Sequence, residues 1–257
     1  MPMRDKAIIT GAAGGMGRAC ARLFGNAHDL ILTDRPSPAF DNIARELNED
    51  GCTVDVHAGD ITDAKLTSAL MNRIGEGERF TLIHAAGVGP SQPDWRTVIE
   101  VNLIASTAGY MMPAIAEIDM LLEDASEPDF VSGLALYIAQ MSGSVSEEAI
   151  AYLISKYGVQ KLAERHAATW GRKGARIVSI SPGLILTPMS RHEMAQSPDA
   201  AAHGNAAAVG RFGTPMDIAR VAQFLASDAA AYISGCDIRV DGGSIAVERN
   251  RASQLGD

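Results

Sequence analysis

The chain has 257 residues, of which 47% are hydrophobic and 21% charged, and this composition is ordinary for a globular protein with a large core. A net charge of −9 argues against nucleic acid as a partner, because that binding needs a basic surface, and favours a small-molecule substrate. The sequence has no apolar run long enough for a membrane span, and its three scattered cysteines fit a cytoplasmic protein better than a disulfide framework or a zinc site.

Short runs rich in β-branched residues alternate with helical patterns along the chain. The first half predicts helices at Gly17–Asn26 and Phe40–Asp50, and strands at Lys6–Thr10, Asp29–Thr33, Thr53–His57 and Thr81–Ala85. The second half predicts a helix at Glu147–Arg172, a strand at Arg176–Ser181, a helix at Met216–Ser227 and a strand at Asp237–Val240. Strands that are apolar on both faces imply parallel pairing between helical layers. We therefore expect one α/β domain over residues 1–257, a Rossmann-like doubly wound parallel sheet with helices on both faces.

Residues 188–213 follow a predicted strand end and have no strand pattern of their own. We interpret them as a mobile flap over a substrate site, and a plain surface insertion of short helices is the alternative. The segment contains Met189, Met194 and many alanines, which favours a hydrophobic substrate such as a steroid or terpenoid.

A glycine-rich turn, TGAAGGMG at residues 10–17, separates the first strand from the first helix. Glycines let the backbone turn tightly and approach a pyrophosphate, which then lies at the positive end of the helix. An ordinary strand-to-helix turn is the alternative, but the acidic residue that closes the second strand favours cofactor binding. The candidate cofactor-binding residues of this turn are Gly11, Gly14, Gly15, Met16 and Gly17.

That acidic residue is Asp34, whose carboxylate can accept hydrogen bonds from both hydroxyls of an adenosine ribose. The same carboxylate would repel a 2′-phosphate, so NAD is expected as cofactor and NADP is less favoured, although the adjacent Arg35 partly compensates. Asp60 and Ile61 follow the third strand, where Asp60 is placed to meet the adenine amine. A simple turn residue is the alternative at both Asp34 and Asp60.

The sequence Tyr152-Leu153-Ile154-Ser155-Lys156 places a phenol and an ammonium four residues apart in a predicted helix. Residues at this spacing share one helix face, so both side chains reach one site. Ser146 followed by two glutamates is typical of an N-cap and first turn, which supports a helix that begins just before Tyr152.

Several short motifs follow one another along the chain: TGAAGGMG at 10–17, Asp34, GDI at 59–61, AAG at 85–87, EVNL at 100–103, YLISK at 152–156, SPGLILTPM at 181–189 and VDGG at 240–243. With these motifs in this order, the chain resembles the short-chain dehydrogenase/reductase family over nearly its whole length.

The resemblance implies that Tyr152 is the general acid/base, with an ordinary pKa of about 10 that Lys156 and an oxidised nicotinamide would lower. It implies that Lys156 also holds the nicotinamide ribose, and that the chain forms a homotetramer or homodimer. It adds further cofactor-binding residues at Ala86, Gly87, Pro182, Gly183, Ile185 and Thr187.

The resemblance is disturbed after the fourth strand, where the family usually has Asn-Asn-Ala-Gly and this chain has His84-Ala85-Ala86-Gly87. We interpret His84 as a core histidine rather than a catalyst. Six histidines in the chain form no close-spaced ligand pair, so no metal site is expected.

The family's substrate-polarising serine ends the fifth strand, and two alignments compete for it here. In the first, Ser106 is the serine, residues 119–141 are an insertion, and Asn102 is structural rather than part of a proton relay. Such an insertion resembles the bacterial 3α-hydroxysteroid dehydrogenase/carbonyl reductase subgroup, and its apolar residues recur at helical spacing: Phe130, Leu134, Tyr137, Ile138 and Met141.

In the second alignment, residues 95–120 form the fourth crossover helix, Leu134–Ala139 is the fifth strand and Ser142 is the nearest serine. A parallel connection needs about a dozen residues or more, which this alignment supplies more comfortably. The motif match favours Ser106 and the connectivity favours Ser142. We adopt Ser106 with Tyr152 and Lys156 as the catalytic set.

The leading functional hypothesis is hydride transfer between NAD(H) and a secondary alcohol or ketone, such as a hydroxysteroid or cyclic alcohol. The alternative is a catalytically silent dinucleotide-binding or scaffolding protein, because a fold alone does not establish chemistry.

Overall fold

Four parallel strands form the first sheet of the computed structural model, which describes residues 4–92, 94–103, 122, 130–142, 145–196 and 207–255. The strands are β1 (Lys6–Thr10), β2 (Asp29–Asp34), β3 (Val54–Ala58) and β4 (Phe80–His84). They pair in the order β3-β2-β1-β4, so β1 and β2 lie in the centre. In this register Thr10 lies opposite His84, which brings the ends of β1 and β4 together at one edge.

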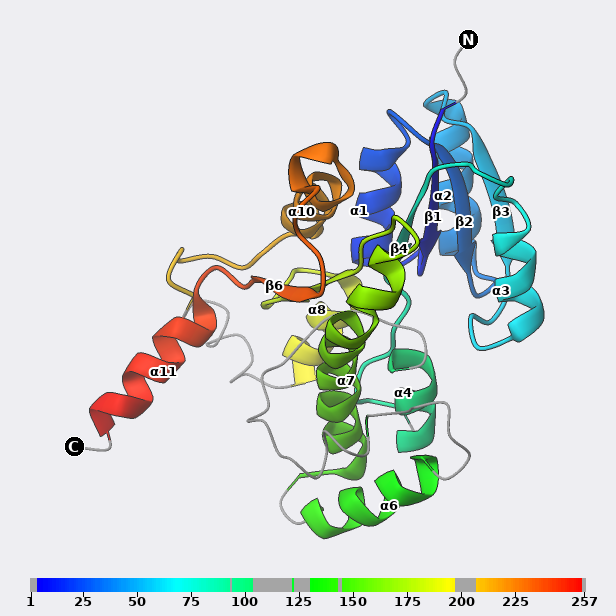
Figure 1. Cartoon of the computed structure of the whole chain (residues 1–257). Coiled ribbons are helices and arrows are strands. Elements are labelled where there is room, and N and C mark those ends of the chain that lie inside the picture. The colour runs from blue at the N-terminus through cyan, green and yellow to red at the C-terminus, as the bar shows by residue number, and fades with distance from the viewer. Residues whose placement is uncertain are drawn as a thin grey trace.

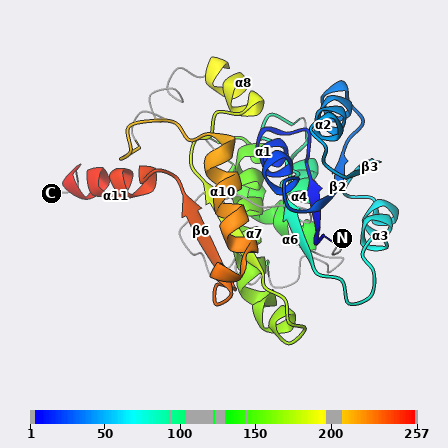
Figure 2. The same ribbon diagram turned by 90° about the horizontal axis from the view of Figure 1, so that it is seen from above.

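Helices cover both faces of this sheet, because the successive residues Ala7–Thr10 of β1 point to opposite faces and are all buried. Ala7 and Ile9 pack on one face with α1 (Gly15–Phe24), α2 (Pro38–Glu49) and α10 (Pro215–Ala226). Ile8 packs on the other face with Leu70 of α3 (Ala64–Met71). Figure 2 shows α10 beside α1, although the two helices are far apart in sequence. The expected Rossmann-like parallel sheet between two helical layers is therefore confirmed.

Local capping explains where the helices begin. Ser37 accepts a hydrogen bond from the Phe40 N–H before α2, and Pro38 occupies the first turn, where no intrahelical donor is required. Thr214 and Asp217 form a reciprocal capping box at the start of α10. Ser146 caps α7 (Glu147–Gly171) through the Ala149 N–H, so this helix begins where the sequence predicts.

A third core lies between α7, α4 (Trp95–Asn102) and α6 (Phe130–Met141), below the first sheet in Figure 1. The predicted strand Leu134–Ala139 is wrong, because these residues lie inside α6. Leu134, Tyr137 and Ile138 are buried at helical spacing, which only a helix can place on one face. The helical reading of the insertion is thus confirmed over Phe130–Met141. Residues 104–121, including Ser106, lie outside the described residues.

Within the described residues, β5 (Val178–Pro182) and β6 (Cys236–Val240) pair as a second, two-stranded parallel sheet. The turn η2 (Asp228–Ala230) precedes β6, and α11 (Ser244–Leu255) follows it and extends away from the other elements in Figure 1. The first part of the predicted flap is α8 (Pro188–Gln196), and its far end returns to Ile185 through a bridge at Gly213. No helix in the described ranges is both long and apolar enough to cross a membrane.

The packing of α1 against the sheet yields a stability prediction. Phe24 is fully buried between α1 and the first sheet, so Phe24→Ala should lower the free energy of unfolding by about 3–5 kcal/mol. The control Phe224→Ala removes a phenylalanine ring from an exposed position of α10 and should change the free energy of unfolding by less than about 0.5 kcal/mol. Urea denaturation measures both, and equal effects would contradict this assignment of the core.

Candidate active site

The glycine-rich turn is built by backbone contacts that leave no room for side chains. Gly11 has a φ of +67°, and a Cβ there would come within 2.6 Å of the Ala85 carbonyl oxygen and the Ala86 nitrogen. A Cβ on Gly17 would collide with the carbonyl oxygen of Gly11. The Gly14 N–H donates to that same oxygen at 3.0 Å, which closes the turn. Glycine at these positions therefore lets the turn, the first helix and the loop after β4 approach one another.

The same turn faces the segment that follows β5. A Cβ on Gly15 would lie 2.8 Å from Cγ2 of Thr187, so the two segments are in close contact. The Ser190 N–H donates to the Thr187 hydroxyl at 3.1 Å, which holds Thr187 at the start of α8. The structure thus brings two predicted cofactor-binding segments together, although they are more than 150 residues apart in the chain.

Asp34 lies at the end of β2, beside the glycine-rich turn. Its carboxylate accepts hydrogen bonds from the Ala13 N–H at 2.8 Å and from the Arg35 N–H at 2.7 Å. The turn therefore orients a carboxylate at the position expected to bind an adenosine ribose. Arg35 itself is exposed.

Asp60 forms the hydrogen bonds of a turn residue, which was the alternative to a contact with adenine. Its carboxylate accepts from both the N–H and the hydroxyl of Thr62, at 2.9 and 2.8 Å. These hydrogen bonds, with a smaller contribution from the charge of Arg35, lower the pKa of Asp60 below its ordinary value. Asp60 and the partly buried Ile61 lie beyond the end of β3.

Thr10 and His84 join the ends of β1 and β4. The Thr10 hydroxyl lies 2.7 Å from Nδ1 of His84 and accepts a hydrogen bond from the Ala86 N–H at 3.2 Å. Burial, with repulsion from Lys156, lowers the pKa of His84 to about 4, so its imidazole is neutral at neutral pH. These contacts support the core role expected for His84, whereas the role of Thr10 was not predicted.

Asn102 holds the loop after β4 from the side of α4. Its fully buried amide donates to the Val88 carbonyl oxygen and accepts from the Val88 N–H, both at 2.8 Å. This pair of bonds satisfies both backbone groups of one residue, which supports the structural role expected for Asn102.

Tyr152 and Lys156 lie one turn apart on α7, as their spacing predicts. The Lys156 amine is 5.2 Å from the centre of the Tyr152 ring, and a Cβ on Gly87 would be 3.5 Å from that amine. Lys156 is only 4% exposed, and this burial lowers its pKa from 10.5 to about 8. The phenol, the amine and the loop after β4 therefore form one site.

The predicted nicotinamide-binding stretch begins at the end of β5. The Gly183 N–H donates to the Val240 carbonyl oxygen at 3.0 Å, and a Cβ on Gly183 would lie 2.7 Å from the Asp241 Cα. Ile185 is buried and bridges to Gly213. These contacts fix the stretch between β6 and the end of the predicted flap.

Ser142, the serine of the second alignment, follows a helix and does not end a strand. Ser142 follows the last turn of α6, is exposed, and donates its hydroxyl hydrogen to the Ala139 carbonyl oxygen at 2.9 Å. Its hydroxyl thus interacts with its own helix end, and the strand that would have carried it is a helix.

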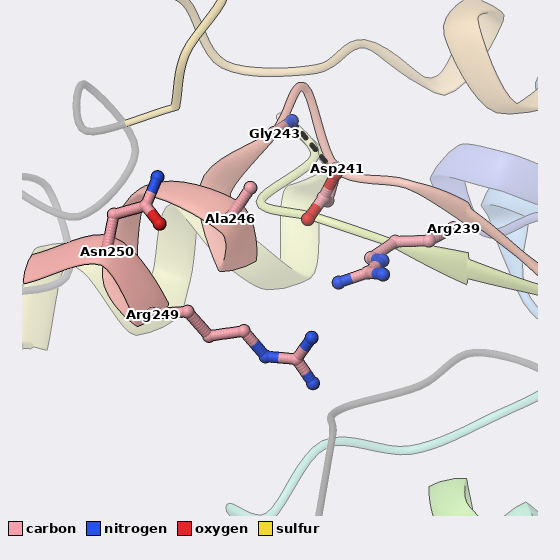
Figure 3. Close-up of a pocket in the computed structure, with 6 residues that line it drawn as sticks. All are labelled: Arg239, Asp241, Gly243, Ala246, Arg249 and Asn250. Atoms are coloured by element: carbon pink, nitrogen blue, oxygen red, sulfur yellow. Dashed lines mark hydrogen bonds between the residues drawn. The ribbon is translucent and has the colours of Figure 1, made fainter. Parts of the chain in front are cut away.

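A separate hollow of about 410 Å³ lies where β6 passes into α11. Figure 3 shows Arg239 and Arg249 among the residues that line it, and Asp241 bound to the Gly243 N–H. Its lining residues are Arg239, Asp241, Gly243, Ala246, Arg249 and Asn250, none of which belongs to the predicted site. The close approach of Gly183 to Asp241 connects its border to the predicted nicotinamide-binding stretch.

Known proteins resemble this chain in sequence and in fold. A family model described as enoyl-(acyl carrier protein) reductase matches residues 11–244, a range that includes Gly11–Gly17 of the glycine-rich turn, Tyr152 and Lys156. The D-threitol dehydrogenase of Mycolicibacterium smegmatis is 32% identical over 92% of this chain and 91% of that protein. The galactitol 2-dehydrogenase (L-tagatose-forming) of Cereibacter sphaeroides is 31% identical over 92% of this chain and 93% of that protein.

The same architecture occurs in a solved structure of levodione reductase, with a TM-score of 0.71 and 25% identity over 95% of this chain and 98% of that one. The fold and the site define a nicotinamide-dinucleotide-binding oxidoreductase. The chain belongs to the short-chain dehydrogenase/reductase family.

The buried amine of Lys156 yields a pH-dependent stability prediction. Its folded-state pKa of about 8 lies below the ordinary value of 10.5, so the charged amine destabilises the folded chain at pH 7. Lys156→Met should raise the free energy of unfolding there, by up to about 3 kcal/mol. Between pH 8 and 10.5 the folded wild type loses a proton that the unfolded chain keeps, so the wild type gains stability and the difference shrinks.

Urea midpoints measured at pH 7, 8 and 9.5 test this expectation. Lys65→Met, at an exposed position of α3, is the matched control and should show no such pH-dependent difference. A Lys156→Met variant that is less stable than the wild type at pH 7 would contradict the predicted cost of the buried charge.

Proposed function

We propose that the chain catalyses reversible hydride transfer between NAD(H) and a secondary alcohol or its ketone. The observation that carries the proposal is the buried Lys156 amine, held between the Tyr152 ring and Gly87. A buried ammonium is costly to the fold, and perturbed ionisable groups of this kind cluster at functional sites. A silent scaffold on the same fold would not need this cost.

The residues present fit a dinucleotide. The turn at Gly11–Gly17 approaches its neighbours closely enough that a side chain would fill the space, and it opens a helix whose positive end suits a pyrophosphate. Asp34 is already oriented beside that turn, Lys156 would hold the nicotinamide ribose, and the residues that follow Pro182 would border the nicotinamide. When bound, the dinucleotide accepts or supplies the hydride.

The proton is handled by the chain's own residues. In the oxidation direction, the substrate hydroxyl proton passes to the deprotonated Tyr152 oxygen while the hydrogen on the alcohol carbon leaves as hydride. In the reduction direction Tyr152 returns its proton to the new alkoxide. The positive charge of Lys156, one turn away, favours the deprotonated phenol electrostatically. We keep Ser106 as the proposed hydroxyl that orients the substrate oxygen.

NAD is the proposed cofactor because Asp34 places a negative charge where the 2′-phosphate of NADP would bind. The charge is fixed by two backbone donors, so it cannot turn away at little cost. Arg35 is exposed next to it and provides partial compensation.

For the substrate we propose a hydrophobic secondary alcohol, bound beneath the 188–213 flap. Met189 of α8 is exposed beyond the nicotinamide-binding stretch and supports this class, which would agree with the 3α-hydroxysteroid dehydrogenase/carbonyl reductase subgroup. Polyols are the second candidate class, because the relatives act, by their names, on threitol and galactitol. A cytoplasmic homodimer or homotetramer remains the expected form.

Tyr152→Phe tests the proposed catalysis directly. The variant loses the proton carrier and keeps the ring, so kcat should fall by at least about 100-fold while NADH still binds. Activity is measured with hydroxysteroids, cyclic alcohols, threitol and galactitol, and NADH binding by fluorescence titration. Tyr232→Phe, at a fully exposed position, is the control. Unchanged turnover in Tyr152→Phe would refute the catalytic assignment.

Asp34→Ser tests the cofactor preference. Removing the carboxylate should lower kcat/KM for NAD and raise it for NADP, each by about tenfold, as roughly 1.4 kcal/mol would produce. Asp50→Ser, at the exposed end of α2, should leave the ratio unchanged. A wild type that prefers NADP, or a variant with the same ratio as the wild type, would exclude this role for Asp34.

A further inference from the structure

A polar chain connects the catalytic helix to the second sheet. The Gln160 side chain on α7 donates from Nε2 to the Ser181 hydroxyl oxygen at 3.0 Å. Ser181 on β5 donates to Oδ2 of Asp237 on β6 at 2.7 Å. Ser179 donates to the other carboxylate oxygen at 2.6 Å. Three elements that are distant in sequence therefore meet through four side chains.

The directions of the hydrogen bonds in this polar chain are determined by the groups that form them. A carboxylate only accepts, so each serine must give its single hydroxyl proton to Asp237. Ser181 then has only acceptor capacity left, and Gln160 must present its N–H groups rather than its oxygen. Both serines are buried, at 2% and 6% exposure, so a reversed or missing partner would leave a polar atom unsatisfied.

Two members of this polar chain, Gln160 and Ser181, adjoin the proposed reaction site. Gln160 lies four residues after Lys156 and thus on the same face of α7, one turn further along. Ser181 directly precedes Pro182, where the predicted nicotinamide-binding stretch begins. A shift of α7 along β5 would therefore change the distance between the Tyr152–Lys156 pair and that stretch, and would break the bond between Gln160 and Ser181.

We propose that Gln160, Ser181 and Asp237 are positioning residues that set the register of the catalytic helix against the nicotinamide-binding stretch. This inference rests on the proposed function, because its consequence is the alignment of the proton carrier with the hydride donor or acceptor. Small errors in such an alignment reduce the rate of the chemical step more than they reduce binding.

The test reverses the hydrogen bonds while keeping the shapes of the side chains. Gln160→Glu places a second acceptor against Ser181, and Asp237→Asn replaces one acceptor oxygen by a donor. Gln160→Glu should lower kcat by at least about tenfold and change KM for NAD by less than about threefold. Asp237→Asn should lower kcat less, because Gln160 can turn its amide and accept the Ser181 proton through its oxygen. In the double variant the new amide at position 237 can donate to Ser181, and Ser181 can donate to the new carboxylate at position 160. The kcat of the double variant should therefore return to within about threefold of the wild type.

Rescue separates positioning from a general structural role. Gln223→Glu, on the exposed face of α10, is the matched control and should leave kcat unchanged. A Gln160→Glu variant with wild-type kcat, or a double variant no better than Gln160→Glu, would overturn the proposal. Should a single variant fail to fold, the double variant decides alone: a folded and active double supports the proposal, and an inactive one refutes it.

Hydrogen exchange distinguishes a failure here from a failure of the proposed function. Amide protection in the turn Lys156–Gln160 should decrease in Gln160→Glu and recover in the double variant, with no substrate or cofactor present. If the wild type shows no dehydrogenase activity but this pattern holds, the proposed function fails and the coupling of α7 to the second sheet stands. If protection is unchanged in Gln160→Glu, the coupling is refuted whatever the activity.

Discussion

The burial of a single amine is the constraint on which the site depends. Lys156 is nearly inaccessible to water, and this lowers its pKa to about 8 because the charged form loses its hydration. The ring of Tyr152 offers a face 5.2 Å away, which favours a cation only modestly. The buried charge therefore costs stability at this position of α7. Under the proposed function, this cost is explained by the need for a charge beside a phenol.

Close backbone approach is the second condition for the site. The turn after β1, the loop after β4 and the segment after β5 converge only because glycine occupies their contact points. A Cβ on Gly11 would meet the β4 loop, and one on Gly15 would meet Thr187. Side chains then fix what the glycines allow: Thr10 binds His84 and the Ala86 N–H, and Asn102 binds Val88. Flexible residues make the convergence possible, and buried hydrogen bonds make it specific.

Regular periodicity made most of this fold predictable. The strands of the first sheet and the long helix α7 lie within a few residues of their predicted bounds, because apolar alternation and capping residues are local signals. Leu134–Ala139 was misjudged as a strand in one alignment, since a short apolar run fits either structure until its burial is known. The pairs Thr10–His84 and Ser181–Asp237 join residues 74 and 56 positions apart, and no local pattern encodes such contacts.

Asp34 shows how a local hydrogen bond becomes a property of the whole site. The Ala13 N–H belongs to the glycine-rich turn, so the bond to Asp34 couples the shape of that turn to the end of β2. Under the proposed function, the carboxylate is oriented before the cofactor arrives, and little ordering remains to oppose binding of a ribose with free hydroxyls. A 2′-phosphate would meet the same oriented charge without a change of conformation to relieve it. Discrimination between the two dinucleotides would then follow from preorganisation of the turn as much as from the charge itself.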